Sequence, residues 1–360
     1  MLQSSPPATM PDRGLVLVTG ATGFTGGYLT RALLARGYGV RALVRPRTDA
    51  RPLVDAGVEI AVGDLVVARD VERAAAGVDM IYHIAGLFRT ANHGATAYRA
   101  VHVKGTRHVV EAAARHRVPR VVHCSTAGVH GAISDVPGRE DSPLEPRDMY
   151  QLTKLEGEQV AREAFREGLP GVVVRPVGIY GPGDMRFLKL FRSVHQRRFR
   201  MFGSGEVPYH LTYIDDLVDG LILCGERPEA LGQTYILAGA EYVSLNQLVR
   251  MVAEAVGVPV PQGRLPLWPL VAAAALCETV CVPLRIDPPI HLRRVAFFHH
   301  PRAFSIRKAS QELGFVPRVP VREGVRRTAE WYFEHGHLQG PAPARAVPLE
   351  PRSRSHPSYR

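Results

Sequence analysis

Short apolar runs alternate with longer amphipathic stretches through the first half of this 360-residue chain. Between Gly14 and Val177, six runs rich in Val, Ile, Leu and Ala are each too short for a typical helix and apolar throughout. Such runs are typical of parallel strands that helices cover on both faces of a sheet. The predicted strands are GLVLVTG, GVRALVR, VEIAVGDL, VDMIYHIAG, PRVVHCST and PGVVVRPV.

The stretches between these runs carry apolar residues every three or four positions, which predicts helices. They are GYLTRALLARG, DVERAAAG, AYRAVHVKGTRHVVEAAARHR and MYQLTKLEGEQVAREAFREG, the last of which should end at Gly168. Strands that alternate with helices in this way predict a doubly wound α/β fold of the Rossmann type. Ligands bind such sheets at the carboxyl ends of the strands.

The rhythm changes after Tyr180, where glycine and proline become more frequent. YIDDLVDGLILCGE still reads as a helix and QTYILAG as a further strand. The expected parts are a disordered N-terminus (1–13), a Rossmann domain (14–181, rejoined by 212–240), a smaller substrate-binding lobe (182–211 and 241–338) and a disordered Pro/Arg-rich tail (339–360).

A glycine-rich turn joins the first predicted strand to the first predicted helix. Gly20, Gly23 and Gly26 are spaced three residues apart. Glycines at such a turn let the backbone approach a pyrophosphate, whose charge meets the helix N-terminus. The turn therefore predicts a dinucleotide cofactor. The residues predicted to contact it here are Gly20, Thr22, Gly23, Phe24, Thr25 and Gly26.

The end of the second predicted strand bears on which dinucleotide binds. An acid there would bond the adenosine ribose and repel a 2′-phosphate. Val44 stands in that place, followed by Arg45 and Arg47. Arginine can bind a phosphate bidentately, so NADP(H) is favoured and NAD is the alternative. Further cofactor contacts are predicted for Asp64, Leu65, Ile84, Ala85, Gly86, Pro176 and Val177.

Candidate acid–base chemistry lies at Tyr150 and Lys154, which share one face of a predicted helix. A nearby ammonium stabilises a phenolate, so the pKa of the tyrosine should fall toward working pH. Such a phenol can give a proton to a carbonyl or take one from an alcohol. Ser125 and Thr126, at the end of the fifth strand, could hydrogen-bond the same oxygen, with Ser125 able to replace Thr126 in part. Taken alone, the Tyr/Lys pair could also be an ordinary surface pair.

Together, TGATGFTG, GDL, the Ser–Thr strand end, YQLTK and RPVGIYGPG resemble the extended short-chain dehydrogenase/reductase superfamily of the NAD-dependent epimerase/dehydratase type. The resemblance covers about residues 14–338. It implies that Thr126 polarises the substrate oxygen and that Tyr150 is the acid/base. It also implies that Lys154 binds the nicotinamide ribose and lowers the pKa of the tyrosine. One departure is His102 in HVKGT, where the family usually has asparagine. We expect a mostly neutral change there, in a polar contact near the cofactor or in the proton relay.

Two enzyme classes compete for the substrate. An NDP-sugar 4-epimerase or dehydratase with bound NAD needs cations for a pyrophosphate. Tyr209 and His210 replace the arginine that usually precedes Y-x-x-D-D, and R-x-G-D is absent. The favoured class is an oxidoreductase of a hydroxyl or ketone on a steroid-like or polyketide-like skeleton. FFHHPRAFSIRKASQELGF resembles 3β-hydroxysteroid dehydrogenase-like and sterol-carboxylate dehydrogenase-like members. A non-catalytic NADP-sensing protein is a third, disfavoured class. Apolar surface for such a substrate is predicted at Trp268, Leu270, Leu276, Val280, Phe297 and Phe298.

Residues 265–284 form an apolar stretch with one acid. It is too short and too interrupted by proline for a confident membrane span. It could line an apolar pocket, rest on a bilayer surface as a peripheral attachment, or be an ordinary core helix.

Composition limits which binding partners and which cellular compartment we expect for the protein. The net charge of +11 is scattered in no recognisable nucleic-acid module, so we expect no nucleic acid. Four cysteines without metal or disulfide spacing, and an N-terminus without a signal peptide, predict a cytoplasmic protein with no metal. A small-molecule substrate and a homodimer partner complete the expectations.

Overall fold

The computed structural model of the chain describes residues 13–88, 94–281 and 295–340. The N-terminal and C-terminal segments that the sequence predicts to be disordered lie outside the described residues, apart from Arg13, Gln339 and Gly340.

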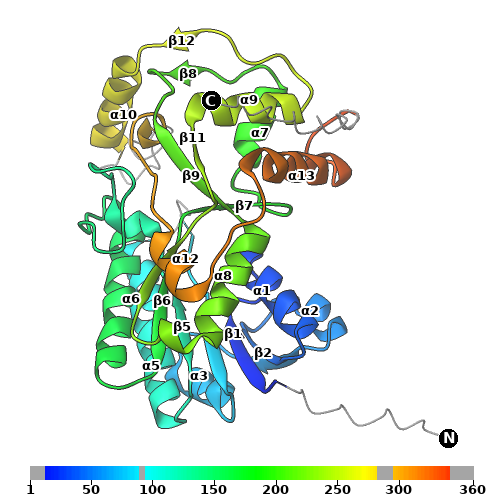
Figure 1. Cartoon of the computed structure of the whole chain (residues 1–360), viewed down its shortest axis with the longest axis vertical. Coiled ribbons are helices and arrows are strands. Elements are labelled where there is room, and N and C mark those ends of the chain that lie inside the picture. Colours follow the sequence, from blue (N-terminus) through cyan, green and yellow to red (C-terminus); the bar gives the residue numbers. More distant parts are fainter. Residues whose placement is uncertain (1–12, 89–93, 282–294, 341–360) are drawn as a thin grey trace, which may run out of the picture.

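A central sheet of seven parallel strands organises the molecule (Figure 1). The spatial order is β10-β6-β5-β4-β1-β2-β3, so the strand order reverses between β1 and β4. Such a reversal opens a crevice at the carboxyl ends of the strands. The doubly wound fold predicted from the sequence is confirmed. The strands are β1 (Leu15–Thr19), β2 (Gly39–Val44), β3 (Glu59–Val62), β4 (Met80–His83), β5 (Val121–Cys124), β6 (Gly171–Pro176) and β10 (Thr234–Leu237).

Helices cover both faces of this sheet because its strands are apolar on both sides. In β1, Val16 and Val18 point into one buried cluster, while Leu17 points into the other. The first cluster takes in α1 (Phe24–Ala35) and α8 (Ile214–Glu226), which pack on each other. The second lies under α3 (Ala68–Ala75) and α5 (Gly105–Arg115), and α6 (Met149–Arg166) packs beside α5. Short α2 (Arg51–Asp55) connects β2 to β3.

The long helix predicted around residue 102 is interrupted by a π-helical turn. The segment runs as α4 (Ala95–Arg99), the π turn η1 (Ala100–Lys104) and α5. Helix α6 approaches this turn so closely that a Cβ on Gly157 would lie 2.1 Å from the carbonyl oxygen of His102. Position 157 therefore requires glycine.

The remaining elements gather at one end of the molecule, beyond the carboxyl ends of the strands (Figure 1). A second sheet has the order β11-β9-β7, and β12 pairs with β8. These strands and the adjoining helices are β7 (Gly178–Tyr180), β8 (Met201–Phe202), β9 (Pro208–Tyr213), β11 (Tyr242–Ser244), β12 (Arg264–Leu265), α7 (Leu188–His195), α9 (Leu245–Ala255), α10 (Trp268–Cys281) and α13 (Val321–Glu334). Helix α12 (Arg307–Leu313) packs against the edge strand β10.

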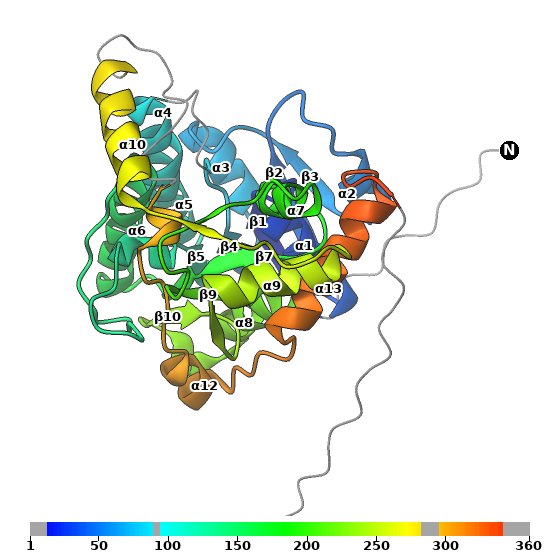
Figure 2. The ribbon, with the colours of Figure 1, turned by 90° about the horizontal axis from the view of Figure 1, so that it is seen from above.

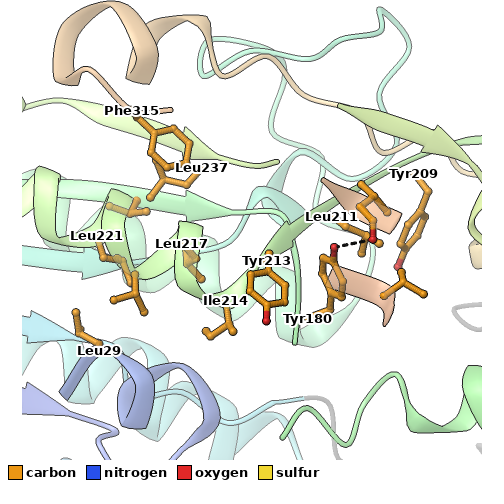
Figure 3. Close-up of a cluster of buried hydrophobic side chains, with 14 of the residues drawn as sticks. Leu29, Tyr180, Tyr209, Leu211, Tyr213, Ile214, Leu217, Leu221, Leu237 and Phe315 are labelled. Carbon is orange, nitrogen blue, oxygen red and sulfur yellow. Dashed lines mark hydrogen bonds between the residues drawn. The ribbon is translucent and has the colours of Figure 1, made fainter. Parts of the chain in front are cut away.

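One buried cluster joins this second group to the central sheet (Figure 3). Leu29 of α1 and Leu217 of α8 belong to it, as do Tyr180 and Tyr213 of the second sheet. The rings of Tyr180 and Tyr213 meet edge to face, with their centroids 5.6 Å apart. This shared core fixes the second group of elements above the carboxyl ends of the strands.

Helix α10 stands at the rim of the molecule (Figure 2). Its described residues include one fully buried side chain, Ala274, while Trp268 is 74% exposed and Leu276 68% exposed. The interpretation of 265–284 as an ordinary core helix is therefore wrong for the described residues; 282–284 lie outside them. Among the described helices, none combines the length and apolarity that crossing a bilayer requires.

Candidate active site

The glycine-rich turn after β1 has the backbone that the motif predicts. Gly20 has a φ of +79°, which glycine adopts at little cost, and its carbonyl accepts the N–H of Gly23 at 3.0 Å. A Cβ on Gly26 would lie 2.1 Å from that carbonyl oxygen. Helix α1 then begins at Phe24 with no side-chain cap from Gly23. Its first amides are thus open to an anion such as a pyrophosphate.

The loop after β4 lies directly against this turn. A Cβ on Gly20 would come within 2.9 Å of Ala85, and the N–H of Ala85 donates to Thr19 Oγ1 at 3.2 Å. Two neighbouring contacts hold the loop: His83 Nδ1 meets Thr19 Oγ1 at 2.8 Å, and Leu87 N–H donates to His102 Nε2 at 3.0 Å. The structure therefore brings the predicted contacts Ile84, Ala85 and Gly86 beside the glycine turn.

The turn after β2 places two arginines on the surface. Thr48 N–H donates to the carbonyl of Arg45 at 3.2 Å, which closes a four-residue turn. Arg47 occupies its third position with a φ of +69°, a conformation that favours glycine. Neither Arg45 nor Arg47 has an acidic partner among the described residues. Two exposed guanidinium groups without an acidic partner among these residues thus follow β2, where the sequence predicts that the cofactor is discriminated.

Asp64 and Leu65 differ in what they can offer a cofactor. The Asp64 carboxylate accepts the N–H of Val66 at 3.1 Å and is half-buried, so part of it remains accessible. Leu65 has a buried side chain packed against Gly105, and its carbonyl accepts from His108 Nδ1 at 3.0 Å. Its side chain thus belongs to the core. Pro176 ends β6, and Val177 follows with its N–H bonded to the carbonyl of Leu237 at 3.1 Å.

Two adjacent hydroxyls at the end of β5 have different partners. Ser125 Oγ donates to Glu158 Oε2 at 2.6 Å. Thr126 Oγ1 accepts the N–H of Gly128 at 3.1 Å, which caps the short helix η2 (Ala127–His130). Within the described part of the chain, no acceptor takes the proton of Thr126 itself. Thr126, which is half-buried, can therefore donate to a ligand, whereas the Ser125 proton is already committed.

Helix α6 carries the predicted acid/base pair. The ring of Tyr150 meets the rings of Phe88 and His102 edge to face, with both centroid distances 5.6 Å. Lys154 is buried, and its ammonium donates to the carbonyl of Cys124 at 2.5 Å. Burial lowers the pKa of Lys154, and the nearby Cys124 and Glu158 oppose that shift. Because Cys124 ends β5, this bond ties the lysine to the strand that leads into Ser125 and Thr126.

A buried ion pair behind the hydroxyls was not predicted from the sequence. Glu158 and Arg175 are 0% and 1% exposed, and their side chains meet at 2.6 Å. Arg175 also reaches the carbonyl of Glu140 and His130 Nε2. The signal was present in PGVVVRPV, where one arginine interrupts an otherwise apolar strand. A buried charge needs a partner, but its identity depends on the tertiary structure.

Comparison with known proteins agrees with this fold. The model of the NAD dependent epimerase/dehydratase family matches residues 16–238, and the chain belongs to that family. Its members and relatives are NAD-dependent oxidoreductases or epimerases, and this chain is an enzyme of that kind. The predicted resemblance to the extended short-chain dehydrogenase/reductase superfamily is confirmed.

Three curated relatives span most of the chain. A 4-hydroxy-2-methyl-3-oxo-4-farnesyl-3,4-dihydroquinoline-1-oxide ketoreductase of Stigmatella aurantiaca is 31% identical over 86% of this chain and 93% of its own. A 2-alkyl-3-oxoalkanoate reductase of Stenotrophomonas maltophilia is 32% identical over 87% and 97%. A 3-beta-hydroxysteroid dehydrogenase of Mycolicibacterium neoaurum is 31% identical over 95% and 98%.

Two solved structures show the same arrangement. The crystal structure of gox2253 has a TM-score of 0.79 and 31% identity, and it covers 90% of this chain and 99% of that one. MoeE5 in complex with UDP-glucose and NAD has a TM-score of 0.71 and 25% identity, with 89% and 99% covered. Similar structures thus occur with NAD and with a nucleotide sugar bound.

Proposed function

We propose that this enzyme transfers hydride between NADP(H) and a hydroxyl or ketone on a lipophilic substrate. The observation that carries this proposal is the state of His210 on β9, where sugar-nucleotide enzymes of this kind usually have an arginine nearby. His210 is buried, its Nδ1 accepts the N–H of Phe304 at 3.3 Å, and its Nε2 lies 2.9 Å from the carbonyl of Gly239. Burial lowers the pKa of His210. A neutral imidazole with both nitrogens bonded offers nothing to a diphosphate.

Aromatic rings occupy the surroundings of this position. Tyr209 is buried, and its ring meets that of Phe297 with a centroid distance of 5.4 Å. Phe298 packs against Phe202 at 5.3 Å. Apolar rings favour the binding of an apolar skeleton over that of a charged nucleotide. The activities of the ketoreductase, reductase and hydroxysteroid dehydrogenase relatives support the same substrate class.

The side chains at the ends of β5 and α6 suit proton transfer to a substrate oxygen. When bound, the nicotinamide supplies or accepts the hydride. In reduction, Tyr150 gives its proton to the carbonyl oxygen while the Thr126 hydroxyl donates a hydrogen bond to the same oxygen. The Lys154 ammonium stabilises the resulting phenolate and would also bind the nicotinamide ribose. Ser125 supports the strand end through Glu158.

The cofactor preference rests on Arg45 and Arg47. Both follow β2, both are exposed, and neither is neutralised by an acid in the described residues. A guanidinium there can pair with a 2′-phosphate, which NADP(H) has and NAD(H) lacks. The glycine turn fits either dinucleotide, so these arginines decide between them.

The second candidate is an NDP-sugar 4-epimerase or dehydratase with tightly held NAD, favoured by the likeness to MoeE5 with UDP-glucose and NAD. The test is a panel of apolar ketones and alcohols set against UDP- and dTDP-sugars, read by NADPH absorbance and product chromatography. Mass spectrometry of the purified protein would also identify any retained dinucleotide. Turnover of apolar carbonyls with exchangeable NADP(H) is expected. Turnover of a nucleotide sugar alone, with retained NAD, would establish the epimerase instead.

We also propose that α10 rests on a lipid surface. Its exposed residues recur every three or four positions, so they form one face of the helix. That face carries Trp268, Pro269, Ala272, Ala273, Leu276, Thr279 and Val280, and none of these is charged. An apolar helical face with a tryptophan suits the interface of a bilayer, and the net charge of +11 favours anionic lipid. A homodimer in the cytoplasm remains the expected state of assembly and location.

A further inference from the structure

His102 connects two parts of the site. One is the loop after β4, which holds the predicted cofactor contacts Ile84, Ala85 and Gly86, and the other is α6, which carries Tyr150. His102 lies in the π turn η1 and is 2% exposed. Its Nε2 accepts the N–H of Leu87 at 3.0 Å, and its Nδ1 lies 2.8 Å from Thr153 Oγ1. Its ring meets the ring of Tyr150 at 5.6 Å with an interplanar angle of 80°, and the ring of Tyr98 lies 5.7 Å away.

The hydrogen bonds of His102 fix its tautomer. A backbone amide can only donate, so Nε2 facing Leu87 must be unprotonated and Nδ1 must carry the proton. Nδ1–H therefore donates to Thr153 Oγ1, and Thr153 gives its own proton to the carbonyl of Met149 at 2.8 Å. A proton on Nε2 would set two N–H groups against each other. Burial, and then the charge of Lys154, lower the pKa of His102 to about 3, which agrees with a neutral ring.

This chain of hydrogen bonds ends in the first turn of α6. Thr153 lies between Tyr150 and Lys154 in the sequence, and its hydroxyl also approaches the carbonyl of Tyr150 at 3.3 Å. The imidazole thus anchors the backbone of the turn and contacts the ring that it carries. An asparagine, which is usual at this position in the family, has no ring to place against Tyr150.

We propose that His102 is a positioning residue for Tyr150. Its two nitrogens hold the loop at Leu87 and the first turn of α6 at a fixed separation, and its ring limits how the phenol can turn. It passes no proton during turnover, because both nitrogens are engaged with backbone and Thr153. The proposal rests on the proposed role of Tyr150 as the acid/base.

Three variants separate the contacts. His102→Phe keeps a ring against Tyr150 and removes both hydrogen bonds. His102→Asn can keep a donor near Thr153, and His102→Gln can keep an acceptor near Leu87, but both lose the ring. His108→Phe is the matched control, because His108 is a buried histidine of the adjoining helix whose Nδ1 bonds the carbonyl of Leu65 and not the partners of His102.

The expected pattern splits kcat from cofactor affinity. A displaced phenol costs roughly 10–100-fold in kcat, since small misplacements of a reacting group have effects of that size. His102→Gln should therefore lose kcat and keep the Kd for NADPH, measured by fluorescence titration. His102→Phe should lose kcat and also weaken NADPH. His102→Asn should regain part of the kcat lost in His102→Phe, and His108→Phe should change neither quantity beyond about twofold.

A measurement without substrate tests the positioning role even if the proposed reaction is wrong. The ultraviolet titration of Tyr150 is obtained by subtracting the Tyr150→Phe spectrum from that of its parent, with and without His102→Phe. A shifted titration in the His102→Phe background supports positioning even if no ketone in the panel is reduced. Unchanged kcat together with an unchanged titration in His102→Phe would overturn the proposal. If His102 had a purely structural role, all of its variants would lose thermal stability to the same extent, and kcat would not fall separately from the Kd for NADPH.

Discussion

At the scale of single residues, the site depends on which hydroxyl groups already donate their proton to a hydrogen bond within the protein. Ser125 and Thr126 are neighbours in the sequence, and the sequence suggests that one can replace the other. In the structure, Ser125 donates to the buried Glu158, whereas Thr126 keeps its proton for a ligand. The two hydroxyls therefore have different expected roles.

Replacing Tyr150 by phenylalanine should abolish hydride transfer and leave cofactor binding nearly intact, because only the proton donor is removed. The measurement is steady-state kinetics on the best substrate of the panel, with NADPH titration as the check on folding. Retention of more than a few per cent of kcat would remove Tyr150 from the proposed mechanism.

Thr126→Ala should lower kcat by about 10²–10³-fold, the usual effect of losing one hydrogen-bond donor to a developing oxyanion. Thr126→Ser should restore most of the activity because it returns the hydroxyl. Ser125→Ala should mainly reduce stability, by about 1.5–3 kcal/mol, since it removes one buried hydrogen bond to the charged Glu158, which keeps its bonds from Arg175. Chemical unfolding and kinetics on the three variants distinguish these outcomes. A larger kcat loss in Ser125→Ala than in Thr126→Ala would reverse the assignment.

At the scale of elements, the turn after β2 and the exposed face of α10 are the most informative. Arg47 holds a left-handed conformation that glycine would adopt without strain. Residual strain in a loop next to a binding site is consistent with a functional side chain. On α10, an apolar face lies open at the rim of the molecule.

Arg47→Gly should stabilise the fold by up to about 1 kcal/mol and weaken NADP(H) more than NAD(H), because the strain and the cation are removed together. Arg45→Ala should weaken NADP(H) selectively without the gain in stability. Arg117 is the matched control, since it also has a positive φ of +52° but follows α5, before β5. Arg117→Gly should affect stability alone. Equal losses for both cofactors in the Arg45 and Arg47 variants would exclude them as discriminators.

Trp268→Glu combined with Leu276→Glu should reduce cosedimentation with vesicles of mixed neutral and anionic lipid, because the charges cannot enter the interface. Val316→Glu serves as the control, since Val316 is also 68% exposed but lies far along the chain from α10. Activity on a water-soluble ketone should stay unchanged in Val316→Glu. If the wild-type protein does not cosediment with such vesicles, a lipid surface is not the partner of α10.

At the scale of the whole molecule, buried neutral histidines should make the fold sensitive to acid. Burial lowers the pKa of His83 to about 3, as it does for His102, and holds that of His123 well below its usual value. Below pH 6.5 these histidines bind protons in the unfolded chain but stay neutral in the folded chain. The free energy of unfolding therefore falls as the pH drops from about 6.5 toward 3. Each such histidine adds a slope of about 1.4 kcal/mol per pH unit.

Denaturant unfolding at pH 8, 7, 6 and 5 measures that slope. His123→Leu should make it shallower and raise stability by about 1–3 kcal/mol, because both ring nitrogens of His123 are buried without a hydrogen-bond partner in the described structure. Val316→Ala is the control at an exposed position without a titratable group and should leave the slope unchanged. Stability that does not vary between pH 7 and 5 would contradict the neutral state of these rings.

Much of the fold could be predicted because its signals are local. Strand runs apolar on both faces, helical periodicity and the glycine turn depend on neighbours in the chain, and a Cβ on Gly26 would collide with the carbonyl of Gly20, only six residues earlier. The same locality made the Tyr150–Lys154 pair visible. The π turn at 100–104 was not predicted from the sequence.

The sequence by itself determined the doubly wound sheet, the position of the dinucleotide turn and the residue types available for proton transfer. Only the tertiary structure decided which of those groups are engaged. In the tertiary structure, Ser125 donates a hydrogen bond to Glu158, Lys154 donates to the carbonyl of Cys124, and His102 lies between Leu87 and Thr153. These partners lie 15 to 51 residues apart in the chain. Periodicity and spacing report local geometry, whereas a hydrogen bond between distant segments exists only once the packed core has brought them together.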